Sequence, residues 1–228
     1  MKQYKAIFLD WDDTIGDFSH AEQYALRDLY SIYGLERLYA DFQDFYDCYH
    51  PYNIYLWELY GRSEITKEEL AFRRFYHPVE SMQNGESAAK RMAEDFLRLT
   101  TKYFRLLPGA EETVRYLSER YPLTIVSNGF VEVQYTKIRL SGLSDCFRHV
   151  VLSEEAGVQK PNPLIYEQAL QLNGIQRDEV LMIGDSYNSD IQGAINAGID
   201  QLWITKDLAD SRPSTYRTGD ISDCKTLL

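Results

Sequence analysis

Short apolar runs alternate with stretches of helical periodicity along most of this chain. The runs are nearly continuous, which is typical of strands covered on both faces of a sheet. They occupy residues 4–9, 123–126, 149–152, 180–183 and 201–205. Apolar residues at helical spacing fill 111–120, 131–140, 164–172 and 189–197. Because parallel strands need long crossovers, this alternation predicts an α/β fold with a doubly wound parallel sheet.

The first crossover is far longer than the others. About 110 residues separate the first two expected strands, whereas a crossover helix with its loops needs roughly 12 to 30. The intervening segment has helical periodicity nearly throughout, as in Met92, Phe96 and Leu99. We therefore expect a helical domain over residues 17–105, inserted into a core made of 1–16 and 106–228. The tail, 206–228, is expected to wrap over the surface and end in a short helix.

Composition and charge exclude several classes of partner. The chain has 228 residues, of which 44% are hydrophobic, and 24 Lys and Arg against 35 Asp and Glu give a net charge of −11. That charge disfavours nucleic acid and anionic membranes as partners.

The first apolar run is too short for a signal peptide or a membrane span. Cys48, Cys146 and Cys224 are widely spaced, which favours reduced thiols and a cytoplasmic protein, expected as a monomer or small homo-oligomer.

Carboxylates gather where two of the expected strands end. Asp10, Asp12 and Asp13 follow the first strand, and Asp185 and Asp190 follow the fourth. Ligands of an open α/β sheet bind at the carboxyl ends of its strands. Acids crowded there repel one another, and a divalent cation relieves that repulsion. The pattern predicts a site for a hard metal ion.

Groups that suit an anion follow the second strand and precede a later helix. Ser127 and Asn128 offer a hydroxyl and an amide before a predicted helix, whose first N–H groups favour negative charge. Lys160 is a single cation beside Pro161, just before another helix. A metal, an anion cradle and a lysine around a carboxylate indicate phosphoryl transfer, with Asp10 as the nucleophile.

These residues together resemble the four motifs of the haloacid dehalogenase-like hydrolase superfamily. Its members are mostly magnesium-dependent phosphatases with a Rossmann-like core, and the resemblance covers the whole core of this chain. The matching residues are Asp10-x-Asp12-x-Thr14, Ser127, Lys160, and Gly184-Asp185 with Asp190.

The resemblance implies a role for each matching acid. Asp10 would be the nucleophile and a metal ligand. Asp12 would be the general acid and base, with its backbone carbonyl also on the metal. Asp185 would bind Mg²⁺, and Asp190 would support the site from outside the set of residues that contact the metal directly.

The resemblance also implies how the phosphate is held. Ser127 and Asn128 would bind it, and Lys160 would neutralise the nucleophile and the phosphate.

The usual strand order of the family places the first strand between the second and the fourth, which would bring Asp10, Ser127 and Asp185 to one crevice. The helical insertion would be a type I cap that closes over the site, excludes water and selects the substrate.

Parts of the insertion, together with two segments of the core, resemble the bacterial pyrimidine 5′-nucleotidases in particular. The matching segments are 53–60, 65–66, 74–75, 127–130 and 153–162. They imply a pyrimidine nucleoside 5′-monophosphate as substrate, with Arg74, Trp57 and Tyr60 as candidate contacts from the cap. For the aromatic residues the alternative is that they fill the core of the helical domain, and for Arg74 that it is a solvated surface residue.

The sequence thus predicts a Mg²⁺-dependent phosphomonoesterase that acts on a small phosphate ester through an aspartyl phosphate. A phosphoglycolate or sugar-phosphate phosphatase, or a phosphomutase, remains open on the same core. A binding protein that captures a phosphorylated ligand without turnover is disfavoured because all four motifs are complete. Haloacid dehalogenation is disfavoured too, since family members with that activity typically lack an acid at the position of Asp12 and use no metal.

Overall fold

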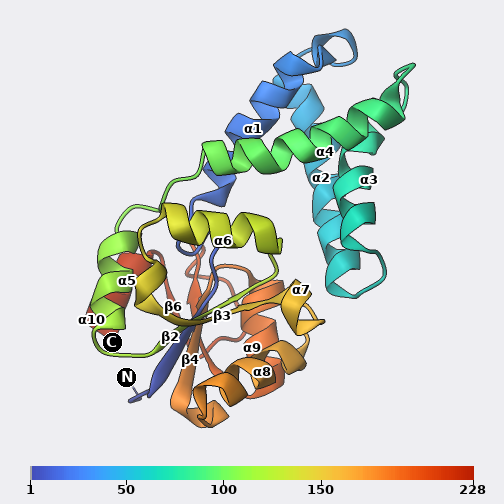
Figure 1. The fold of residues 1–228 in the computed structure, drawn as a ribbon. Coiled ribbons are helices and arrows are strands. Elements are labelled where there is room, and N and C mark those ends of the chain that lie inside the picture. Colours follow the sequence, from blue (N-terminus) through green and yellow to red (C-terminus); the bar gives the residue numbers. More distant parts are fainter. Residues whose placement is uncertain (1) are drawn as a thin grey trace. The chain divides into compact units, whose positions relative to one another are not determined.

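The computed structural model describes residues 2–228, which form two compact units. The core unit joins the residues up to Asp17 to Arg105–Leu228, and the helical unit is Phe18–Phe104 (Figure 1). Among the described residues, no helix has both the length and the apolar character needed to cross a bilayer.

A six-stranded sheet, in the order β3-β2-β1-β4-β5-β6, forms the centre of the core unit. All neighbouring strands pair in parallel, and β1 lies between β2 and β4, as predicted (Figure 1). The strands are β1 (Ala6–Leu9), β2 (Leu123–Ser127), β3 (Phe147–Leu152), β4 (Val180–Gly184), β5 (Asp200–Ile204) and β6 (Tyr216–Thr218).

The tail contributes a strand that the sequence does not predict. β6 pairs with Leu202–Ile204 at the edge of the sheet, within a segment that was expected only to wrap over the surface. Three residues, Tyr-Arg-Thr, carry too little apolar pattern to indicate a strand. The pairing depends on the backbone groups of β5 on the side away from β4, which β6 covers. The predicted short helix at the end is confirmed as α10 (Cys224–Leu227).

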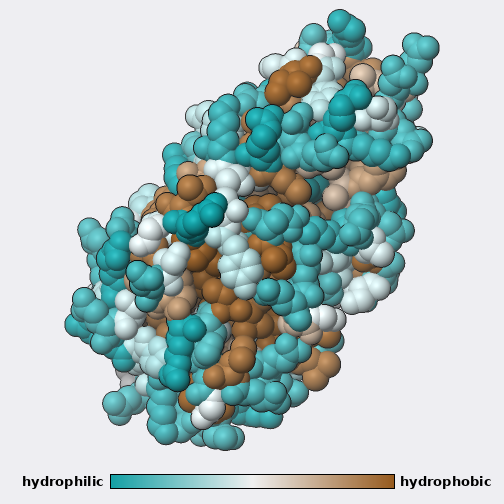
Figure 2. Space-filling model, viewed as in Figure 1, coloured by the Kyte–Doolittle hydropathy of each residue, from teal (hydrophilic) through white to brown (hydrophobic). Residues whose placement is uncertain are grey.

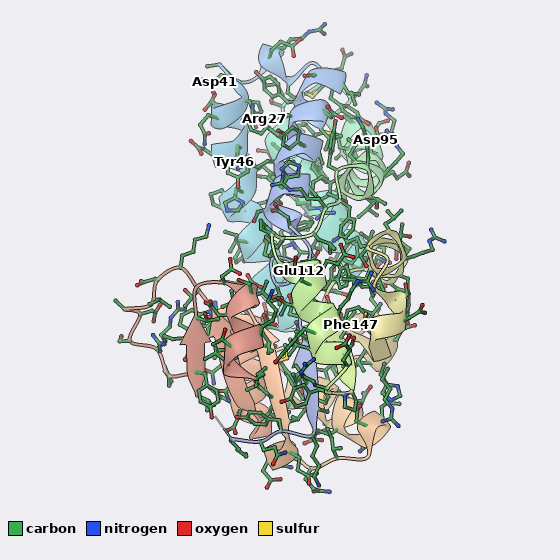
Figure 3. The ribbon with its side chains drawn as sticks, turned by 90° about the vertical axis from the view of Figure 1, so that its left-hand side faces the viewer. Arg27, Asp41, Tyr46, Asp95, Glu112 and Phe147 are labelled. Atoms are coloured by element: carbon green, nitrogen blue, oxygen red, sulfur yellow. The ribbon has the colours of Figure 1, made fainter. Side chains whose placement is uncertain are left out.

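Helices cover both faces of the sheet, which confirms the doubly wound α/β fold. In Figure 1, α5 and α10 lie on one side of the sheet, and α8 and α9 on the other. Lys225 of α10 pairs with Glu112 of α5, labelled in Figure 3, at 3.0 Å. Phe8 and Met182 pack with Tyr166 of α8 in the core on the other side. The helices of this unit are α5 (Ala110–Ser118), α6 (Val131–Leu140), α7 (Ser153–Ala156), α8 (Pro163–Asn173), α9 (Gln192–Ala197) and α10.

The helix expected over 189–197 has two parts. A π-helical turn at Tyr187–Ile191 precedes α9. Ser186 begins the turn, because its side chain accepts a hydrogen bond from the backbone N–H of Ser189. One-turn π segments of this kind are frequent at functional sites.

Four α-helices and one short 3₁₀ helix, Leu35–Arg37, make up the helical unit. The α-helices are α1 (Phe18–Ile32), α2 (Phe42–Gly61), α3 (Lys67–Val79) and α4 (Gly85–Lys102). Asp41 begins α2 by accepting a hydrogen bond from Asp44 N at 2.9 Å, and a capping box of Thr66 and Glu69 begins α3.

Aromatic rings fill the interior of the helical unit. The Tyr49 and Phe75 ring centroids lie 5.4 Å apart, and those of Phe75 and Phe96 lie 5.3 Å apart. Figure 2 shows that the outer surface of this unit is largely hydrophilic. Arg27, labelled in Figure 3, lies over the Phe42 ring at 4.1 Å and so shields part of an apolar side chain from water.

Candidate active site

Lys160 joins the segments that the sequence motifs predict to converge. Its ammonium lies 2.5 Å from Asp10 Oδ1, 2.6 Å from Asp190 Oδ1 and 2.7 Å from the carbonyl oxygen of Val126. Asp10 follows β1, Val126 is in β2 and Asp190 comes after β4, and these three strands are neighbours in the sheet (Figure 1). Three distant parts of the chain therefore meet around one side chain that is only 2% exposed.

The surroundings of Lys160 keep its ammonium charged. Burial alone would lower the pKa of Lys160, but Asp10 and Asp190 raise it above the usual value. An ammonium has three N–H donors, and the three acceptors account for all of them. A buried cation without such partners would cost several kcal/mol, about 3–5 kcal/mol when one partner of a pair is removed.

Burial first, and then their proximity to one another, disfavours the ionised form of the acids of the site. Burial, together with Asp190 and Asp12, raises the pKa of Asp10 to about 7, although Lys160 acts in the opposite direction. Burial and the neighbouring acids raise the pKa of Asp185 well above its usual value. A cation at this position would relieve the repulsion and favour the ionised forms of both.

The arrangement of the acids fits a divalent metal ion. Asp10, Asp185 and Asp190 each place one carboxylate oxygen within 4.8 Å of the others. The Thr14 hydroxyl donates to Asp185 Oδ1 at 3.1 Å and accepts from the Asp185 N–H at 3.1 Å, which orients that side chain. Clustered carboxylate oxygens are the ligands of a hard cation such as Mg²⁺.

Asp190 is bound to protein donors on both of its oxygens. Oδ1 contacts Lys160, and Oδ2 accepts from the Ser186 N–H at 3.0 Å. Gly184 makes room for it, because a Cβ there would lie 2.4 Å from Asp190 Oδ2. This arrangement is consistent with the supporting role expected for Asp190.

Ser127 ends β2 and Asn128 follows it, beside the same loops. Ser127 Oγ accepts from the Gly129 N–H at 3.1 Å, so its own hydrogen can be donated. The Asn128 side chain donates to the Lys160 carbonyl at 2.9 Å and accepts from the Lys160 N–H at 2.8 Å. Both polar ends of this side chain therefore hold the lysine loop, and a phosphate contact from Asn128 would come from its backbone N–H.

Two residues of α6 that no motif predicts contact Asp12. Lys137 Nζ lies 2.6 Å from Asp12 Oδ1, and Gln134 Nε2 lies 2.8 Å from Asp12 Oδ2. A signal is present in the sequence: Val133 and Ile138 define the buried face of the helix, and Gln134 and Lys137 occupy the same face. Polar residues at buried helical positions indicate a buried polar partner.

β5 also contributes to the site through a residue that the motifs do not include. The Trp203 indole N–H donates to the Asp185 carbonyl at 2.8 Å, which fixes the loop that carries this acid.

The three candidate contacts from the helical unit lie in different surroundings. Trp57 is partly buried, and its ring centroid is 5.7 Å from that of the buried Tyr60, edge to face. Arg74 is 2% exposed, and its guanidinium carbon lies 4.6 Å from the Phe96 ring centroid. The alternative of a solvated surface arginine is therefore wrong, because Arg74 is enclosed by the aromatic core. Contact of any of the three with a substrate stays a prediction.

Comparison with known proteins agrees with this geometry. The family model described as haloacid dehalogenase-like hydrolase matches residues 4–198. The pyrimidine 5′-nucleotidase PynA of Streptococcus pneumoniae is 34% identical to the chain, covering 99% of the chain and 94% of PynA. The pyrimidine 5′-nucleotidase YjjG of Escherichia coli is also 34% identical, covering 97% of the chain and 96% of YjjG.

A solved structure shares the fold over the full length. The HAD-hydrolase YfnB of Bacillus subtilis, crystallised with magnesium bound, superposes with a TM-score of 0.86 at 28% identity, covering 100% of the chain and 99% of YfnB. The family match spans both units and includes every motif described above. The chain therefore belongs to the haloacid dehalogenase-like hydrolases.

Proposed function

We propose that this hydrolase is a Mg²⁺-dependent phosphomonoesterase whose substrates are pyrimidine nucleoside 5′-monophosphates. The observation that supports the reaction type is the buried ion pair of Asp10 and Lys160 beside Asp185, at the carboxyl ends of β1 and β4. Similarity to PynA and YjjG over nearly the whole chain supports the substrate class.

Asp10 is the nucleophile in this proposal. Its carboxylate oxygen attacks phosphorus, the bond from phosphorus to the ester oxygen breaks, and an aspartyl phosphate forms. Lys160 stays charged next to the carboxylate and neutralises negative charge on the transferring group. The Ser127 hydroxyl donates to a phosphate oxygen and holds the group in place.

Asp12 transfers protons in both half-reactions. As an acid it gives a proton to the departing ester oxygen, and as a base it takes one from the water that attacks the aspartyl phosphate. The bond from phosphorus to the Asp10 oxygen then breaks, which releases phosphate and restores Asp10. The Asp12 side chain is 28% exposed, so an incoming ester or water can reach it.

Asp10 and Asp185 would hold Mg²⁺ through their side chains, and Asp12 through its backbone carbonyl. When bound, the ion supplies positive charge that stabilises the phosphoryl group during transfer. The raised pKa values of Asp10 and Asp185 support a cation here, because the two carboxylates are costly to ionise without one.

Phosphate release from a panel of esters tests this function. The panel contains UMP and dTMP, the purine nucleotides AMP and GMP, phosphoglycolate and a hexose phosphate, each with Mg²⁺ and with EDTA. We expect the highest kcat/KM for the pyrimidine nucleotides and no turnover in EDTA. Preference for a sugar phosphate or phosphoglycolate would overturn the substrate class. Isomerised sugar phosphate would indicate a phosphomutase, and no turnover of any ester would favour a binding protein.

A further inference from the structure

Gln134 and Lys137 hold the carboxylate of Asp12 from one face of α6. Each carboxylate oxygen has its own donor, Lys137 Nζ at 2.6 Å and Gln134 Nε2 at 2.8 Å. The two donors are three residues apart, so they lie next to each other on the helix. Two separate donors fix the position of the carboxylate and also the orientation of its plane.

The same amide of Gln134 also contacts Ser127. Gln134 Nε2 lies 2.7 Å from Ser127 Oγ, and an amide nitrogen carries two hydrogens, one for each acceptor. Gln134 is fully buried, and its Oε1 has no hydrogen-bond partner within residues 2–228. An unpartnered buried oxygen is unfavourable for stability. The orientation of this amide is therefore set by its two acceptors.

The loop after β2 leaves space for this amide. A Cβ at Gly129 would lie 2.1 Å from Gln134 Nε2 and 2.4 Å from Gln134 Cδ. Any side chain at position 129 would therefore displace Gln134 from Ser127 and Asp12.

Lys137 is a buried cation outside the predicted motifs. Its side chain is 4% exposed, whereas that of its partner Asp12 is 28% exposed. Replacing a buried ion pair with apolar residues of similar volume is often neutral or stabilising. A lysine at this position is thus poorly explained by stability and is better explained by an effect on Asp12.

We propose that Gln134 and Lys137 are positioning residues for the reaction. They hold the Asp12 carboxylate at a fixed place relative to the Ser127 hydroxyl, and so relative to the phosphorus that Ser127 holds. The inference rests on the proposed function, in which Asp12 protonates the leaving oxygen. Displacement of a reacting group by about 1 Å can cost on the order of 100-fold in rate.

Two substrates with different leaving groups distinguish a misplaced Asp12 from a general loss of activity. An alkoxide such as the 5′-oxygen of a nucleoside needs a proton to depart, whereas p-nitrophenolate departs without one. For Lys137→Met, we expect kcat/KM to fall roughly 10- to 100-fold with UMP but less than about threefold with p-nitrophenyl phosphate. Lys137→Arg should recover most of the loss. Arg139→Met, which removes an exposed charge from the same helix, is the matched control and should leave both values unchanged.

A double-mutant cycle tests whether the effect passes through Asp12. In an Asp12→Ala background, Lys137→Met should cause no further loss with UMP, because the group that it positions is absent. Gln134→Leu should lower kcat/KM with UMP and also raise KM for both esters, since Ser127 loses the same donor.

The outcomes distinguish this inference from the proposed function. Suppose that the unmodified protein hydrolyses UMP. If Lys137→Met then loses activity equally with both esters, or causes its full loss also in the Asp12→Ala background, the positioning role is wrong. The proposed function stands in either case. If the unmodified protein hydrolyses neither ester, the proposed function fails and the inference fails with it.

Discussion

Both units of this protein bury charged side chains, but they surround them differently. In the core unit, Lys160 is paired with two carboxylates that lie 150 and 30 positions away along the chain. In the helical unit, Arg74 lies over the rings of Phe75 and Phe96, at 5.2 and 4.6 Å, and Tyr49 and Glu22 also favour its charge. A cation held by hydrogen bonds to two buried carboxylates indicates a reaction site, whereas a cation that lies mainly among aromatic groups is also compatible with packing alone.

The largest loss of activity is expected when the nucleophile is replaced. Asp10→Asn should lower kcat on UMP below about one hundredth of the unmodified value while the fold is kept, because an amide does not attack phosphorus to form the acyl phosphate. Asp13→Asn is the matched control at the same strand end. Asn tolerates its left-handed backbone conformation, φ 59°, and we expect the loss to stay under about tenfold. Substantial turnover by Asp10→Asn would remove Asp10 from this role.

Removing the buried cation of each unit should distinguish the two environments. Lys160→Met leaves Asp190 buried and without its ammonium partner, so we expect a loss of about 3–5 kcal/mol in the free energy of unfolding. Arg74→Met removes ring contacts worth about 0.5–2 kcal/mol, together with the attraction of Arg74 to Tyr49 and Glu22. Glu22 keeps a hydrogen-bond donor in Asn53, so we expect a smaller loss than for Lys160→Met. Urea unfolding of both variants measures the difference. Equal losses would mean that the two buried cations are held in energetically similar ways.

Magnesium should stabilise the protein more as the pH rises. Burial raises the pKa of Asp10 from 3.8 to about 7, so between these values the folded protein binds more protons than the unfolded chain. The stability of the metal-free protein therefore falls as the pH rises through this window.

Mg²⁺ binds the ionised acids, so its stabilising effect should follow the opposite trend. At a fixed Mg²⁺ concentration of about 100 times the Kd at pH 8, the ion should add about 2.7 kcal/mol near pH 8 and less near pH 6, as measured by thermal unfolding. Asp185→Asn is the control that should remove most of the gain. A gain that is independent of pH would argue against these acids as the binding site.

The smallest expected effect concerns the helical unit and the base. If Trp57 stacks on the nucleobase, Trp57→Ala should weaken the binding of UMP by about 1–3 kcal/mol. The loss should be seen as a higher KM, with kcat less affected. Tyr60→Phe, which keeps the ring against Trp57, should change KM little. An unchanged KM in Trp57→Ala would assign its ring to the packing of the helical unit.

The sequence predicts the core unit well because its chemistry lies in short segments at strand ends. β1, β2 and β4 are short apolar runs, and each is followed by the polar residues that meet around Lys160. β6 is not predictable in this way, since three residues with little apolar pattern depend on the edge of β5 for pairing.

Other contacts were missed because they depend on tertiary packing. Gln134 and Lys137 interrupt an apolar helical face, but nothing local identifies Asp12, more than a hundred positions away, as their partner. The Asn128 side chain was expected to face a phosphate, yet both its polar ends bind the backbone of Lys160. Spacing along a chain indicates which residues meet, but not which of several polar atoms each one uses.

The central place of β1 in the sheet has a consequence for how the protein is made. Asp10 is translated early, but the neighbours of its strand, β2 and β4, are translated only after the whole helical unit. The nucleophile therefore stays inert on the nascent chain until Lys160 and Asp190 have followed it. A polypeptide released before β2 would carry Asp10 and none of the groups that give it a function.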